Sequence, residues 1–113
     1  MVLCEISRDA ANGLMSLSDR GRSLRRAVDQ LKSDCSKCAL PSGDYALACG
    51  TSYSIRKYDL APHGTSAMYL AAAVVVCNGG FAAVRLVRRG GIPKLEIFEA
   101  GIGHGPRKLW EVA

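Results

Sequence analysis

The sequence lacks a long hydrophobic run, and this absence argues against a membrane-spanning helix. None of the apolar stretches in its 113 residues reaches the roughly 18 residues that such a helix requires. The first residues show no basic region followed by an apolar core, and residue 2 is not the glycine that N-myristoylation needs. We therefore expect a cytoplasmic protein with no membrane partner.

The sequence lacks an even number of cysteines that could all pair with one another. Five cysteines are an odd number, and without a secretory signal we expect mostly free thiols in a reducing compartment. Cys35 and Cys38 are separated by two residues, the spacing found in many metal-binding and redox motifs. The sequence offers no second such pair. They fall at the C-terminal end of an expected helix, whereas a helix N-terminus favours a reactive thiolate. We predict structural thiols, no metal and no cofactor, with zinc binding and redox chemistry as alternatives.

The sequence also lacks a recognisable catalytic motif. No acidic or basic residue stands at a sequence spacing from Cys77 that would predict a catalytic partner. Cys77 continues an apolar run, so we interpret it as a buried thiol. His104 is a lone histidine in a glycine-rich loop, residues 101–106, which does not follow the GxGxxG order of dinucleotide-binding proteins. This pattern favours a protein that is not an enzyme and leaves enzymatic activity as the alternative.

A chain of this length predicts a single domain over residues 1–113. Hydrophobic residues make up 49% of it, enough to form a core and to exclude wholesale disorder. The pattern divides into a helical part (1–40), a sheet part (44–100) and a glycine-rich tail (101–113). We predict an α+β fold, in which an N-terminal helix or helical pair packs on an antiparallel sheet of about four to five strands.

A seven-residue apolar repeat predicts the helical part. Its members are Leu3, Ala10, Leu17, Leu24, Leu31 and Cys38. Such a repeat forms one apolar stripe, and Gly13 and Gly21 each weaken a single long helix by about 1 kcal/mol. We predict two helices, near residues 3–14 and 19–36, whose stripe packs on the sheet. A seam between two subunits is the alternative.

The longest apolar run, residues 67–77, predicts the centre of the sheet. It ends in three valines and a cysteine, and β-branched residues favour a strand. Asn78 and Gly79 then suit a type I′ hairpin turn. Two strands follow over residues 81–89 and 94–99, joined at a pair of glycines, so this half of the chain forms a meander. Because alanines also favour helices, a helix over the apolar run is the alternative.

Two shorter strands are expected earlier in the chain, over residues 45–49 and 53–58. The apolar run at 67–77 has no polar face, which is typical of a strand buried on both sides. An N-terminal helical layer covers only one side. A partner subunit or a folded-back loop would have to cover the other, and this argument predicts a homodimer.

The net charge of +5 is unevenly distributed. Residues 1–50 hold 7 basic and 6 acidic residues, whereas residues 51–113 hold 8 basic and 4 acidic residues. Clustered arginines grip phosphate or carboxylate in a bidentate manner. We therefore predict a binding module that engages an acidic macromolecule, either nucleic acid or an acidic protein surface, through a basic hairpin. The residues expected to make this contact are Arg85, Arg88, Arg89, Lys94, Arg107 and Lys108.

The second expected helix carries further cations, which alternate with acidic residues. Arg25 and Asp29, for example, stand four residues apart, a spacing at which opposite charges pair on a helix surface. We interpret this face mainly as internally paired, solvated surface, with nucleic-acid contact as the alternative.

A small-molecule-binding protein or small enzyme is the alternative function. A helix that crosses a curved sheet leaves room for an apolar pocket between the two layers. The residues expected to line such a pocket are Tyr45, Cys49, His63, Tyr69 and Cys77.

Overall fold

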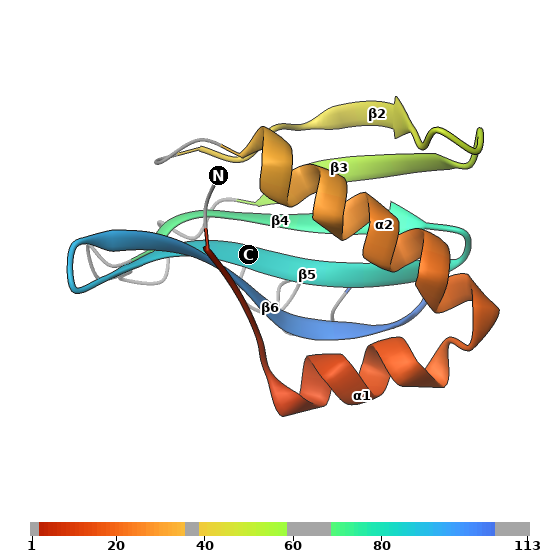
Figure 1. The fold of residues 1–113 in the computed structure, drawn as a ribbon, viewed down its shortest axis with the longest axis horizontal. Helices are drawn as coiled ribbons and strands as arrows, with labels where there is room; N and C mark the ends of the chain where they lie inside the picture. The colour runs from red at the N-terminus through yellow and green to blue at the C-terminus, as the bar shows by residue number, and fades with distance from the viewer. Residues whose placement is uncertain (1–2, 36–38, 59–68, 106–113) are drawn as a thin grey trace.

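The computed structural model describes residues 3–35, 39–58 and 69–105, which form two helices and six strands (Figure 1). In chain order they are β1 (Leu3–Ile6), α1 (Arg8–Ser16), α2 (Asp19–Asp34), β2 (Gly43–Ala46), β3 (Ser52–Tyr58), β4 (Tyr69–Cys77), β5 (Gly80–Arg89) and β6 (Ile92–Ile102). The predicted α+β class is confirmed.

All six strands belong to one sheet, in the order β1-β6-β5-β4-β3-β2. Strands β2 to β6 are each antiparallel to the next, which confirms the meander. Only β1 runs parallel, beside β6 at one edge. Both helices lie over the same face of the sheet, so the fold has two layers (Figure 1).

The two tight turns of the meander have the backbone that their residues predict. Asn78 and Gly79 adopt φ values of 52° and 79°, and Gly90 and Gly91 adopt 58° and 80°. Positive φ at both central positions belongs to a type I′ turn, whose twist matches that of the flanking strands. The run before the first turn is strand β4 from Tyr69 onward, so the helical alternative is wrong there. Residues 67 and 68 lie outside the described part.

The main core lies between the helices and the sheet. Leu24 and Leu31 of α2 are fully buried, in the same cluster as Val75, Leu86 and Leu95 of the sheet. Ala10 and Leu17 of the apolar repeat are buried there too. These four members of the repeat therefore pack within the chain, as the sheet interpretation predicts, and they are too deeply buried to form an exposed subunit seam.

The central strand is buried on both sides, as predicted. Val75 faces the helices, and its neighbour Val74, on the opposite face, is also inaccessible to solvent. There Val74 packs with Phe81 and Ala83 in a second apolar cluster, which Val76 and Phe98 border. The homodimer inferred from this burial stays a prediction.

Helix α1 begins later than the helix predicted near residues 3–14, because the first four described residues form strand β1 instead. Ser7 ends the strand and caps α1, since its side-chain Oγ accepts a hydrogen bond from the N–H of Ala10 at 3.1 Å. The same residue's N–H donates to the carbonyl of Ile97 at 3.0 Å. The added strand explains why the sheet has six strands. At the other end, β6 continues to Ile102, beyond the expected start of the tail.

Helix α1 approaches β6 unusually closely at Gly13. A β-carbon at this position would overlap the carbonyl oxygen of Ala100. Gly13 lies in the helix interior, where glycine is unfavourable by about 1 kcal/mol relative to alanine. The close contact is the reason for glycine here.

Gly13→Ala is expected to lower the free energy of unfolding by about 1–3 kcal/mol, the range of an overpacked contact, despite the better helix propensity of alanine. Urea denaturation followed by circular dichroism measures the change. Asn12→Ala is the control, because Asn12 is exposed in the same helix and its replacement should be neutral or mildly stabilising. Equal stability of the two variants would contradict the close-packing argument.

Candidate interface for an acidic partner

The predicted basic hairpin is largely engaged in contacts within the chain. On the face away from the helices, Arg85 Nε donates to Glu96 Oε1 at 3.0 Å, and a second guanidinium nitrogen donates to the same oxygen. The guanidinium also lies over the Phe98 ring, 4.8 Å from its centroid. Lys94 Nζ lies 2.8 Å from Glu5 Oε1 of β1. Two of the predicted contact residues are thus partly neutralised by neighbouring strands.

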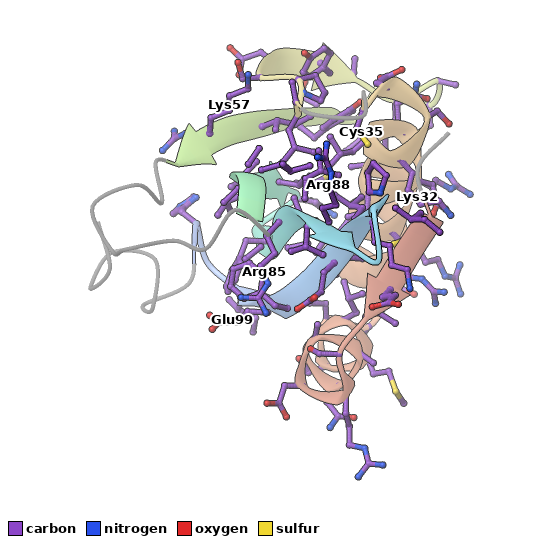
Figure 2. The ribbon with its side chains drawn as sticks, turned by 90° about the vertical axis from the view of Figure 1, so that its left-hand side faces the viewer. Lys32, Cys35, Lys57, Arg85, Arg88 and Glu99 are labelled. Atoms are coloured by element: carbon purple, nitrogen blue, oxygen red, sulfur yellow. The ribbon has the colours of Figure 1, made fainter. Side chains whose placement is uncertain are left out.

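Arg88 does not lie beside these two residues. Arg88 is exposed, and because side chains alternate along a strand it projects to the other face of β5 from Arg85 (Figure 2). The side chain of Arg89, and the whole of Arg107 and Lys108, lie outside the described part. The hairpin's role in binding therefore stays a prediction.

The Arg85–Glu96 pair could have been found in the sequence. A two-residue turn at Gly90 and Gly91 fixes the register, so that Arg89 lies opposite Ile92 and Arg85 opposite Glu96. Opposite charges at directly facing positions of an antiparallel pair attract. Counting back from the turn would have shown that Arg85 has an internal partner.

The predicted pocket residues occupy different environments. Cys77 is buried in the main core, and burial raises the pKa of its thiol. Cys49 is exposed in the loop between β2 and β3. Tyr45 is half-buried and stacks on Tyr53, with ring centroids 5.5 Å apart. His63 and the side chain of Tyr69 lie outside the described part, so the pocket stays a prediction.

The described cysteines are free thiols and form no metal cluster. Cys35 is buried at the C-terminal end of α2, where burial raises the pKa of its thiol. Cys38 lies outside the described residues. Within the described ranges, no three His, Cys, Asp or Glu residues are close enough together to hold a metal ion.

The exposed face of α2 carries cations for which the described residues supply few carboxylate partners. Arg22, Arg25 and Arg26 are exposed and Lys32 is half-buried. The expected pairing with Asp29 does not form. Arg22 approaches Asp19 at 3.9 Å, but both side chains are at least 80% exposed, and such surface pairs contribute little. Among described residues, no carboxylate lies within salt-bridge distance of the other three cations.

Two connected hollows lie where α1, α2 and β1 meet. One encloses about 160 Å³ and extends to Cys4 and Lys32, and the other encloses about 350 Å³ and extends to Met15. They share three residues, Ile6, Leu14 and Arg25, so we treat them as one groove and call it the α1–α2–β1 groove.

The groove combines an apolar floor with a cationic rim. Ile6 is 48% exposed and Met15 78% exposed, and they are among the few large apolar side chains that the described part of the chain leaves in solvent. Arg22, Arg25 and Lys32 line its α2 side. The sequence does not reveal this site, because the helix predicted near residues 3–14 includes Ile6, which stands on the edge strand β1 instead.

No family model, curated protein or solved structure matches the chain. In the part of the chain that the structure describes, no helix is both long and apolar enough to cross a membrane. The function is therefore inferred from the surface chemistry of the described residues.

Cys49 differs from the other described cysteines in its surroundings. Its sulfur lies 3.4 Å from the Thr51 hydroxyl oxygen, and this hydrogen bond is the main cause of a lowered pKa for the Cys49 thiol. A lower pKa means more thiolate at a given pH, and the thiolate is the form that reacts with alkylating agents.

Iodoacetamide is expected to modify Cys49 of the folded protein before Cys35 or Cys77, as read by peptide mass spectrometry. Thr51→Val should move the pH midpoint of Cys49 alkylation upward, because it removes the hydroxyl that stabilises the thiolate. Ser52→Ala, at the exposed neighbouring position, is the control and should leave the midpoint unchanged. An unchanged midpoint in the Thr51→Val variant would show that the hydroxyl does not tune this thiol.

Proposed function

We propose that the protein is a small binding module that engages an acidic macromolecular partner by charge pairing. The exposed face of α2 supports this proposal most strongly. Arg25, Arg26 and Lys32 present three cations on one helix, and no described carboxylate lies within salt-bridge distance of them. Cations without a carboxylate partner are available to a partner's phosphates or carboxylates at little desolvation cost.

The basic hairpin is a second contributor in this proposal. Arg88 and Arg89 flank its tip, whose glycines meet no other atoms where a β-carbon would stand. Arg85 and Lys94 would first have to leave Glu96 and Glu5 to bind a partner with full strength. We therefore assign the larger part of the binding to α2.

The experiment compares two double variants, Arg25→Ala with Arg26→Ala on α2, and Arg88→Ala with Arg89→Ala on the hairpin. Binding to heparin, used as a general polyanion, is measured by calorimetry at several salt concentrations. The wild type should bind less tightly as salt rises, because each neutralised anionic site releases counterions. The α2 variant should lose more affinity than the hairpin variant and show a shallower salt dependence.

Arg8→Ala is the matched control, because Arg8 is an exposed arginine of α1 that lines neither hollow of the groove. Circular dichroism confirms that each variant is folded. Salt-independent binding by the wild type would overturn charge pairing as the mechanism. A larger loss of heparin affinity in the hairpin variant would place the main interface on the hairpin and overturn the assignment to α2.

A further inference from the structure

Strand β1 is an edge strand of the sheet and lies beside the groove. It pairs only with β6 among the described strands. The N–H of Ser7 donates to the Ile97 carbonyl, and backbone groups alternate in direction along a strand, so those of Cys4 and Ile6 point away from β6. An edge of this kind is a template for another extended chain.

The same two residues line the groove with their side chains. Cys4 and Ile6 contribute to the smaller hollow together with Val28 and Ile97, which are apolar. A chain that added beside β1 would therefore bond to the open edge and place alternate side chains against an apolar floor. In other proteins, extended peptides are bound in this way, with backbone hydrogen bonds for affinity and pockets for specificity.

The rim determines which chain fits. Three cations, Arg22, Arg25 and Lys32, and one carboxylate, Asp29, line the two hollows, which leaves a net charge of +2. Lys32 projects from α2 over this edge of the sheet (Figure 2). The side chains of the added strand that do not face the apolar floor would lie near this rim. Acidic residues are favoured at those positions, because the rim is positively charged.

We propose that the α1–α2–β1 groove binds an extended acidic peptide, in which apolar and acidic residues alternate, as an additional strand on β1. This inference rests on the proposed function and names its partner. The four residues of β1 offer two outward positions, enough for a short core of about four to six peptide residues at roughly 3.3 Å each.

The observations favour a peptide over other occupants. Single-stranded nucleic acid needs aromatic side chains for its bases, and none lines either hollow. A second copy of the chain would bring a groove with the same cationic rim against this one. A peptide with carboxylates satisfies both the rim and the strand edge.

The test uses a fluorescein-labelled seven-residue peptide that alternates glutamate and valine, with binding followed by fluorescence anisotropy. A control peptide of the same composition holds its glutamates and valines in separate blocks. A single-stranded oligonucleotide and a long-chain fatty acid are the competitors. We expect the alternating peptide to bind at least about tenfold more tightly than the block peptide, because only it satisfies edge, floor and rim together.

Two variants locate the peptide. Cys4→Pro removes an N–H that points away from β6, so the β1–β6 ladder stays intact while strand addition is blocked. It should weaken binding of the alternating peptide by about tenfold or more, whereas Cys4→Ala, which keeps the N–H, should change it by less than about twofold. Ile6→Glu should also weaken binding, since it places a carboxylate on the apolar floor. Thermal unfolding of each variant confirms an intact fold.

The outcomes separate this inference from the function it rests on. If both peptides bind equally, salt weakens both and Cys4→Pro binds like Cys4→Ala, charge pairing stands and strand addition is wrong. If neither peptide nor heparin binds in a salt-dependent manner, the proposed function itself is wrong. Displacement of the alternating peptide by oligonucleotide or fatty acid at lower concentration than by unlabelled peptide would assign the groove to that ligand and overturn the proposal.

Discussion

The pairing of β4 with β5 is the constraint on which the rest of the structure depends. These two strands hold the longest apolar sequence of the chain, and residues such as Val75 and Leu86 are fully buried where α2 covers them. A sheet with such a face is stable only under an apolar layer, which the leucines of α2 supply. The cations of α2 are consequently held on its outer face, because its inner face is committed to the core.

Charge is distributed over the sheet and the helices in two different ways. On the sheet, cross-strand register brings Arg85 to Glu96 and Lys94 to Glu5, so cation and carboxylate face one another. On α2, Arg25 and Arg26 are exposed, and no described carboxylate lies within salt-bridge distance of them. A carboxylate within reach lowers the electrostatic gain that a partner's anion can offer. This difference, rather than the number of basic residues, is why we propose α2 and the groove beside it as the interface.

Much of the fold could be predicted from local sequence, and most of the site could not. The type I′ turn at Asn78 and the strand that precedes it follow from the conformational preferences of a few adjacent residues. Strand β1 has no such signal, because it is four residues long and becomes a strand by pairing with β6, far away in the sequence. Ser7 shows that separation directly, since its hydroxyl donates to the carbonyl of Phe98, 91 residues away. The groove depends on β1, so it could not be predicted before that pairing was known.

Backbone amide protection on β1 tests the central claim most directly. Nuclear magnetic resonance would follow hydrogen exchange in the free protein and after addition of the alternating acidic peptide. The account predicts an alternating response, in which the amides of Cys4 and Ile6 become protected while that of Glu5, already directed at β6, changes little. Protection confined to the β5–β6 hairpin, or equal at all three β1 amides, would contradict an acidic partner bound at this edge.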